Sequence, residues 1–515
     1  MEKLLRFLKP KEMDFLNDPI SKLIKNISIP ASLGMFFNSM FNFTDTYFAG
    51  NILGKNGLGA LTASFPLFFI FLALGSGIGT GVNVLISTSL GSGDEKKAKE
   101  YVGNGIVFAF LFSLFLTVVA FLVMPFLVKI VSTEDFYAGT LQYMNVLTMG
   151  IAFFIVTGVY NSILQSQGDT ISFTKILLIT VVVNIILDPL FLGVGGILPN
   201  FGTAGVAIAT VISQMITFAY LHIKINKIDL VKNLKKSDYK MKSENIREIL
   251  RQGIPASLNM ATMVMGMFVI MNAIKRLGNS DVLAGYGPAM RIEQLALLPT
   301  LGFSVAAMTL VGRNYGAGNI KRVKQIYNKI LQYGLVITLL GTIFSIIFGK
   351  QLFLIFTKDA DVMREGLKYL YIDAWVYFAY VLISVSIAVL QGLKKPNLGM
   401  YVGAYRQFIA PMILIFILGQ LLRPFIFPQM RKFPSVVKVF DQGSILMVVY
   451  GAFSSAVVAG LWQQVSGITL IYLTLACSVL LTVVMLLALY LPKWLGFNQA
   501  DQITIFFCSS KSICS

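Results

Sequence analysis

The sequence Ile29-Pro30-Ala31-Ser32-Leu33 recurs unchanged 225 positions later, as Ile254-Pro255-Ala256-Ser257-Leu258. A second matching pair has the same spacing, with Gly-Ser-Gly-Asp at 91–94 and Gly-Ala-Gly-Asn at 316–319. Because the matches stay in register over about sixty residues, one unit is present twice in this chain. In a membrane protein, a large internal duplication is typical of a transporter whose substrate path lies between the halves.

The composition predicts a membrane protein. The 515 residues are 56% hydrophobic and 13% charged, and the mean hydropathy is +0.75, whereas about a quarter of the residues of a soluble domain are charged. A helix needs roughly 20 apolar residues to cross a bilayer, and the chain offers a series of such runs. The predicted spans are residues 28–49, 58–88, 102–131, 140–164, 174–196, 203–223, 254–275, 283–311, 326–349, 366–391, 399–422, 444–463 and 467–491. We therefore expect an all-α integral membrane fold.

The basic residues predict the orientation of the chain. They cluster in alternate loops, which is the positive-inside pattern and explains the net charge of +18 without nucleic-acid binding. The N-terminus is charged and is not followed by a cleavable signal, so we expect it to stay in the cytoplasm. The sequence thus predicts a multi-pass protein of the cell (inner) membrane with the lipid bilayer as its solvent.

Four parts are expected along the chain. Residues 1–223 hold six hydrophobic runs, and residues 224–250 form a polar cytoplasmic connector that is either a hinge or only a solvated loop. Residues 251–417 form a second bundle, pseudo-symmetric with the first, which is truncated in its eleventh helix. Residues 418–515 form a foreign tail with two long helices.

Ionisable residues inside the predicted spans carry the functional signal. A charge in hydrocarbon costs about 2.5–3.5 kcal/mol on insertion scales, so an intramembrane carboxylate is a functional candidate. Asp45 lies in an unusually polar first span, and Asp188 follows Asn184 by one helical turn. Thr210 adds a hydroxyl in the sixth span. The alternative is that Asp45 or Asp188 has a purely structural role, for example Asp45 as a cap at a helix end.

The four side chains Asp45, Asn184, Asp188 and Thr210 predict an oxygen-rich pocket. Oxygen ligands suit a hard cation such as Na+, while H+ needs only a carboxylate that burial keeps protonated near neutral pH. The sequence does not distinguish between Na+ and H+ as the bound ion. We expect no cofactor, and no nucleophile or metal arrangement indicates an enzyme.

Further polar and flexible side chains are candidates for a substrate cavity. Methionine clusters can form compliant surfaces for varied apolar ligands, although they more often belong to ordinary packing. The candidates are Asn38, Asn42, Gln214, Asn259, Met263, Glu293 and Asp373.

Residues 15 to about 415 resemble the multidrug and toxic compound extrusion (MATE) transporters. The resemblance rests on Thr44-Asp45-Thr46 with Gly50, Asn184 with Asp188-Pro189, Gly205-Val-Ala-Ile-Ala-Thr210, Arg291-Ile with Pro299 and Gly302, and Tyr315-Gly316-Ala317. It implies two six-helix bundles around a cavity that opens alternately to each side, and export of cationic or amphipathic drugs against a sodium or proton gradient. Asp45, Asn184, Asp188 and Thr210 match positions that bind the coupling ion in the N-terminal lobe of one branch. Asn259 stands in the region where another branch has an acidic residue, which favours the N-lobe arrangement.

From about residue 418 the chain instead resembles part of the bile acid:sodium symporter-like family. The matching motifs are Leu421-Leu422-Arg423-Pro424, Asp441-Gln-Gly443-Ser-Ile-Leu-Met-Val-Val-Tyr450, Leu495-Gly496-Phe497 and Phe507-Cys508-Ser509-Ser510-Lys511-Ser512. We interpret the chain as a composite, produced by a gene fusion, by an error in sequence assembly, or by divergence of the C-terminus. The tail alone should be inactive, because most of a symporter's scaffold is missing from it.

The sequence therefore predicts a secondary active antiporter that exports drugs or organic cations in exchange for Na+ or H+. Two alternatives remain. A lipid or oligosaccharide flippase would share the bundle architecture but should have a strongly cationic cavity, whereas this N-terminal path is acidic. A non-functional chimera would follow if the truncated second bundle cannot complete its packing.

Overall fold

The computed structural model describes residues 13–132, 134–276, 280–354 and 359–406, with the side chains of 55, 263–276, 280–284 and 287 left out. All of them belong to the first of two compact units, Met1–Pro411 and Met412–Ser515. The predicted spans 444–463 and 467–491, and the symporter-like motifs, lie outside the described residues.

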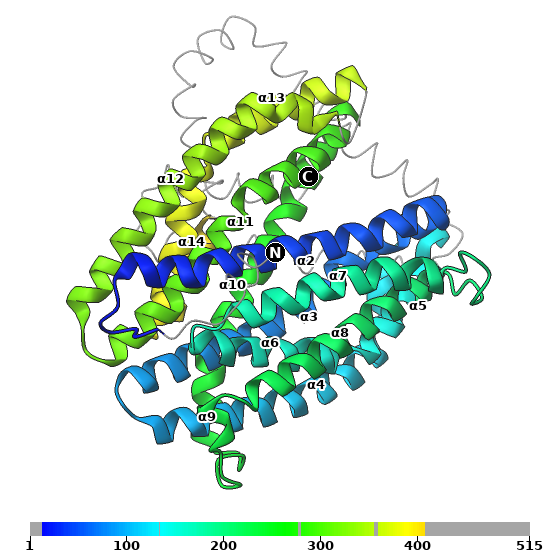
Figure 1. The fold of residues 1–515 in the computed structure, drawn as a ribbon. Coiled ribbons are helices and arrows are strands. Elements are labelled where there is room, and N and C mark those ends of the chain that lie inside the picture. Colours follow the sequence, from blue (N-terminus) through cyan, green and yellow to red (C-terminus); the bar gives the residue numbers. More distant parts are fainter. Residues whose placement is uncertain (1–12, 133, 277–279, 355–358, 407–515) are drawn as a thin grey trace, which may run out of the picture. The chain divides into compact units, whose positions relative to one another are not determined.

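The described part of the chain is all-helical (Figure 1). In chain order the helices are α2 Ile20–Ile52, α3 Gly54–Gly91, α4 Glu95–Val131, α5 Glu134–Met149, α6 Ile151–Ser166, α7 Ile171–Phe191, α8 Thr203–Ile225, α9 Asp229–Lys232, α10 Ser243–Arg276, α11 Ser280–Gly316, α12 Ile320–Phe353, α13 Ala360–Ala374, α14 Tyr377–Gly392 and α15 Pro396–Ala404. Six of these helices are long and apolar enough to cross a membrane, and two bent pairs would each add one more span. The predicted all-α, multi-span membrane fold is confirmed.

The predicted spans 140–164 and 366–391 are wrong as continuous helices. Each is a pair of helices, α5 with α6 bent by 51° and α13 with α14 bent by 53°. The first break is at Gly150, where an added Cβ would lie 2.7 Å from Val211 Cγ2 of α8. Hydropathy cannot reveal such a break, because the break depends on close packing between helices rather than on polarity.

Predicted boundaries at the connector and at the last described helix also differ from the structure. The predicted connector 224–250 is partly helical, because it contains α9 and because α10 begins at Ser243. The predicted span 399–422 begins earlier, with α15 at Pro396, and its remainder from 407 on lies outside the described residues.

The duplicated sequence folds into duplicated turns. Gly93 and Gly318 take φ values of +78° and +72°, which only glycine adopts without strain. The next residue caps the following helix in each repeat. The Asp94 side chain accepts a hydrogen bond from the Lys97 amide (2.9 Å), and the Asn319 side chain accepts one from the Arg322 amide (3.1 Å).

Loss of either cap should destabilise the protein measurably. We expect Asp94→Ala and Asn319→Ala each to remove about 1 kcal/mol, because an N-terminal amide of the helix loses its acceptor. The measurement is thermal unfolding in detergent, where a fall of about 2 °C is expected. Lys96→Ala, an exposed position in the first turn of α4, is the control. Unchanged midpoints in both cap variants would contradict this assignment.

The duplication also appears where the two bundles meet. Gly77 of α3 lies against Ser257 of α10, and Gly302 of α11 lies against Ser32 of α2, so closely that a Cβ at either glycine would overlap the serine hydroxyl. Both partners of one contact are 225 positions from those of the other. The two halves are therefore related by a pseudo-two-fold axis that passes between these helix crossings.

A second pair of crossings repeats this relation nearer the connector. A Cβ at Gly91 would overlap the carbonyl oxygen of Arg313, and a Cβ at Gly316 would overlap the carbonyl oxygen of Thr88. Each helix thus presents a glycine to the backbone of the other. Small residues at such positions let membrane helices approach closely, and dispersion contacts then hold them together.

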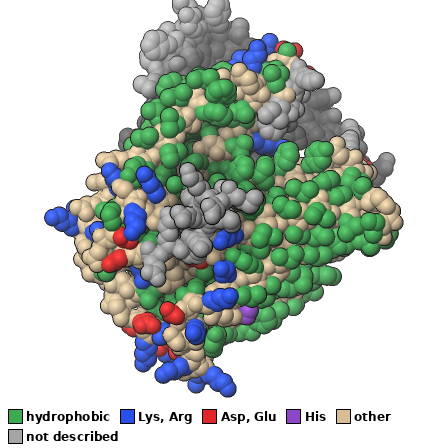
Figure 2. Space-filling view, viewed as in Figure 1, with side chains coloured by type: hydrophobic (Ala, Val, Ile, Leu, Met, Phe, Trp, Pro, Cys, Tyr) green, Lys and Arg blue, Asp and Glu red, His purple; other side chains and the backbone are tan. Residues whose placement is uncertain are grey.

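The outer face of the first bundle is apolar (Figure 2). Large side chains of α4 are exposed there, with Leu122 77% and Phe126 65% accessible. Water would make such a surface unfavourable, whereas acyl chains make it neutral. This face therefore suits contact with lipid, and the Lys and Arg side chains in this view gather beyond one end of it (Figure 2).

Candidate functional site

Three helices of the first bundle bring the acidic residues together. Helix α7 packs against both α2 and α8 (Figure 1). Gly34 lets α2 approach α7, because an added Cβ would already lie 3.0 Å from Thr174 Oγ1. The Thr174 hydroxyl in turn donates to the carbonyl oxygen of Pro30 (2.6 Å). This close crossing fixes the register that places Asp45 beside Asp188.

Asp45, Asn184, Asp188 and Thr210 form one buried cluster. Their exposed fractions are 5%, 0%, 0% and 3%. The Thr210 hydroxyl lies 2.9 Å from Asp45 Oδ2, and Asn184 Nδ2 donates to Asp188 Oδ1 (3.3 Å). Asp45 is close enough to interact directly with both Asn184 and Asp188. Asp45 lies inside α2, seven residues before its end at Ile52, and so is not a helix-end cap.

The cluster has unused oxygens and lacks a compensating charge. Asp45 Oδ1, Asn184 Oδ1 and Asp188 Oδ2 are buried without a hydrogen-bond partner in the described part of the chain. The groups there that act on the two carboxyls are Asn184, Thr210 and each other, none of which is cationic. Two carboxylates so close together cannot both stay ionised in a dry interior unless a cation joins them, so the cluster suits either a bound cation or a bound proton.

Tyr143 and Ser213 belong to this neighbourhood as well. Tyr143 of α5 is 8% exposed and interacts electrostatically with both Asp45 and Asp188. Ser213 is fully buried, and its hydroxyl has no hydrogen-bond partner among the described residues. Tyr143 was not predicted from the sequence. A tyrosine in an otherwise ordinary apolar span gives no signal in the sequence.

The remaining candidates of the first bundle lie apart from the acid cluster. Asn38 and Asn42 are exposed on α2, and the Asn42 amide donates to the Asn38 carbonyl oxygen (2.9 Å). Gln214 is half-buried on α8, one residue beyond Ser213. Among the described residues, no contact joins these three side chains to the carboxyls.

The second bundle also holds an acidic cluster. The sequence did not predict that its members, Glu293 and Asp373, lie together. Glu293 of α11 is 7% exposed and interacts directly with Asp373 of α13. The Tyr369 hydroxyl donates to Glu293 Oε2 (3.3 Å). Arg406 lies 5.5 Å from the centre of the Tyr380 ring and attracts Glu293. This cluster differs from the first in having a cation within reach.

Asn259 and Met263 complete the predicted cavity residues. Asn259 is half-buried on α10 and touches Gly403 of α15, where an added Cβ would overlap its side-chain oxygen. The Met263 side chain lies outside the described residues. In the described part of the chain, no three His, Cys, Asp or Glu side chains gather into a metal-binding group.

Comparison with known proteins identifies the fold that carries these clusters. A sequence profile of the MatE family matches residues 30–190 and 255–417, which together exceed half of the chain. The two matched stretches begin 225 positions apart, which is the spacing of the duplication. The chain belongs to the MATE family. This is a family of transporters and not of enzymes.

Individual MATE proteins are similar at the level of distant relatives. The "Probable multidrug resistance protein YpnP" of Bacillus subtilis is 28% identical over 387 residues, which cover 75% of this chain and 84% of that protein. A structure described as the outward-facing conformation of a multidrug resistance MATE family transporter superposes with a TM-score of 0.73 at 23% identity. The superposed residues cover 78% of this chain and 89% of that structure.

The C-terminal part of this MATE chain has a second relationship. A profile of the SBF-like CPA transporter family matches residues 378–514, so the two family matches overlap over residues 378–417. The uncharacterized protein PA2026 of Pseudomonas aeruginosa is 46% identical over 100 residues. Those residues are 19% of this chain and 30% of PA2026, so the chain spans about a third of that relative. The predicted SBF-like C-terminal region is confirmed.

Proposed function

We propose that this protein is an antiporter that exports cationic or amphipathic drugs in exchange for Na+ or H+. The observation that carries the proposal is the cluster of Asp45, Asn184, Asp188 and Thr210, with its three unpartnered buried oxygens. The similarity to multidrug resistance proteins supports the substrate class. The buried carboxyls of both bundles, Asp45 and Asp188 in the first and Glu293 in the second, favour cations over the anionic substrates of a flippase.

The coupling ion acts by neutralising the acid cluster. An ion bound to Asp45 and Asp188 removes the repulsion between the carboxyls and allows α2, α7 and α8 to pack differently. Coupling requires the ion and the drug to stabilise the two cavity orientations differently, because equal affinities would shift no population. At a membrane potential of about 100 mV, one charge contributes about 2.3 kcal/mol, or roughly fifty-fold accumulation.

The exchanged ion can be identified in proteoliposomes that contain ethidium. A sodium gradient, a pH gradient and both together are imposed in turn, and ethidium fluorescence is followed. The proposal expects one of the gradients to drive export of the dye. Export of the dye without either gradient would refute the antiporter. The absence of any export under all three conditions would also refute it.

The substrate cavity is proposed to include Asn38, Asn42, Gln214, Asn259, Met263, Glu293 and Asp373. Among these, Glu293 offers the clearest test, because its buried charge attracts a cationic drug. We expect Glu293→Gln to weaken ethidium binding about tenfold, or by about 1.4 kcal/mol. Binding is measured by fluorescence polarisation, with an uncharged dye as the comparison. An equal loss for both dyes would show that shape rather than charge was disturbed.

The proposed orientation places the connector and the N-terminus in the cytoplasm of a cell (inner) membrane. It rests on the alternation of basic loops.

The proposed parts are a six-helix bundle at 1–223, a connector at 224–250, a truncated bundle at 251–417 and a symporter-like fragment at 418–515. Antiport in the full chain but not in a chain ending at 417 would show that the fragment supplies packing that the second bundle lacks. No antiport in the full chain would support the non-functional chimera.

A further inference from the structure

The segment Met13–Asp18 crosses the boundary between the two bundles at the connector end. On the first bundle it packs against Gly168, where an added Cβ would lie 2.9 Å from the Phe15 ring. On the second bundle it meets Asn314, whose side-chain amide donates to the Phe15 carbonyl oxygen (3.2 Å). The Arg322 guanidinium also donates to the Asp18 carbonyl oxygen. We refer to Met13–Asp18 as the strap.

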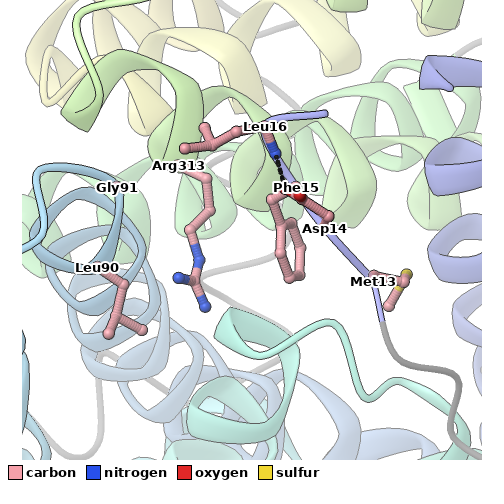
Figure 3. Close-up of a pocket in the computed structure, with 7 residues that line it drawn as sticks. All are labelled: Met13, Asp14, Phe15, Leu16, Leu90, Gly91 and Arg313. Atoms are coloured by element: carbon pink, nitrogen blue, oxygen red, sulfur yellow. Dashed lines mark hydrogen bonds between the residues drawn. The ribbon is translucent and has the colours of Figure 1, made fainter. Parts of the chain in front are cut away.

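Arg313 is held between the strap and the first bundle (Figure 3). Its guanidinium carbon lies 4.7 Å from the centre of the Phe15 ring, within the range of a cation–π interaction. On the other side, its Nη2 and Nε donate to the Ser166 carbonyl oxygen (2.9 and 3.3 Å). That oxygen belongs to the C-terminus of α6, where the helix dipole favours a positive charge. Arg313 of α11 thereby joins the second bundle to the first.

The strap also closes a hydrophobic core that both bundles share. Met13 and Phe15 pack against this core, whose buried side chains come from α2, α3, α11, α12 and α14 and therefore from each bundle. Separation of the bundles at this end would expose the core to water. The contacts of Met13 and Phe15 with this shared core therefore depend on the two bundles being together.

The strap forms a turn of its own and lies over a cavity. A cavity of about 310 Å³ lies beneath it, lined by Leu90, Gly91 and Arg313 (Figure 3). The segment holds its own turn, because the Asp14 carboxylate accepts hydrogen bonds from the amides of Leu16 and Asn17 (3.0 and 3.1 Å). Hydrogen bonds from Asn17 and these amides also lower the pKa of Asp14. For the strap to lift, its contacts with Arg313, Asn314 and Arg322 must break.

We propose that the strap is a latch that stabilises the state in which the two bundles are closed at the connector end. In an alternating transporter, opening of the cavity toward the connector requires the latch to detach from Arg313 and Asn314. The latch therefore sets how much of the protein is closed at this end when neither drug nor an ion gradient is present. The inference rests on movement of the bundles in the proposed transport cycle, but not on the identity of the drug or ion.

Distances between spin labels test the latch directly. Cysteines that replace Lys96 of α4 and Lys321 of α12 carry the labels. Both side chains are exposed, and each follows one of the duplicated turns at Gly93 and Gly318. The native Cys477, Cys508 and Cys514 are replaced by serine. Pulsed electron resonance on the full chain in lipid nanodiscs, without drug or gradient, then gives the proportion of closed and open molecules.

We expect Phe15→Ala and Asn314→Ala each to raise the ratio of open to closed molecules about tenfold, which equals about 1.4 kcal/mol. Phe110→Ala, which removes an exposed ring of α4, should leave the ratio unchanged. Unchanged distances in both strap variants would overturn the latch, and so would an equal change in the Phe110 control. The readout needs no transport, so failure of the latch and failure of the proposed antiport are seen separately.

Discussion

Asp188→Asn is expected to abolish ion-driven ethidium export from proteoliposomes. Asparagine keeps the size of the side chain and can still accept a hydrogen bond from Asn184, but it can neither bind a proton nor neutralise a cation. The side chain is fully buried, so water cannot replace the lost charge. We expect the export rate to fall at least about 100-fold, or by about 2.7 kcal/mol of coupling.

Asp135→Asn is the matched control for this variant. It makes the same chemical change in the same bundle, on the exposed start of α5. The control should export ethidium at the original rate. Ion-driven export that persists in Asp188→Asn would remove this residue from the coupling mechanism, whatever the drug specificity of the protein.

Gly91→Ala and Gly316→Ala are expected to be the most damaging small changes at the boundary between the bundles. In each case the added methyl group would overlap a backbone carbonyl oxygen, that of Arg313 or that of Thr88. A backbone atom cannot turn aside as a flexible side chain can, so the helices must separate. Overpacking of this kind costs about 1–3 kcal/mol or more.

The measurement for the glycine variants is thermal unfolding in detergent, together with ethidium export. We expect the unfolding midpoint to fall by about 5 °C in each variant and export to be largely lost. Gly158→Ala is the control, because its methyl group would meet nothing closer than 3.9 Å. Because Gly91 and Gly316 are pseudo-symmetric, a large effect at only one of them would contradict the proposed equivalence of the two crossings.

The sequence predicted the architecture because a duplication fixes many positions at once. A match at 29–33 and another at 91–94 imply the same helices and turns in both halves, and the turns at Gly93 and Gly318 have the same backbone conformation. The breaks inside the predicted spans 140–164 and 366–391 could not be read in the same way. The Gly150 break depends on the approach of Val211, which lies sixty-one positions away in sequence.

The sequence also indicated the first acidic cluster but not the second. Asp188 and Asn184 share a helix face by their spacing, and a buried carboxylate is conspicuous in an apolar span. Glu293 and Asp373 are eighty positions apart on α11 and α13, so only the fold shows that they meet. The contact of Arg313 with Ser166 and Phe15 likewise depends on how the bundles pack, which the sequence does not show.

A double-mutant cycle on Asp45 and Asp188 tests the central claim most directly. Ethidium export driven by the coupling gradient is measured for the original protein, Asp45→Asn, Asp188→Asn and the double variant. If the two carboxyls form one ion site, loss of either should remove the coupling, and the double variant should be no slower than the single variants within about twofold. Effects that multiply in the double variant, or a single variant with undiminished export, would show that the carboxyls do not act as one site.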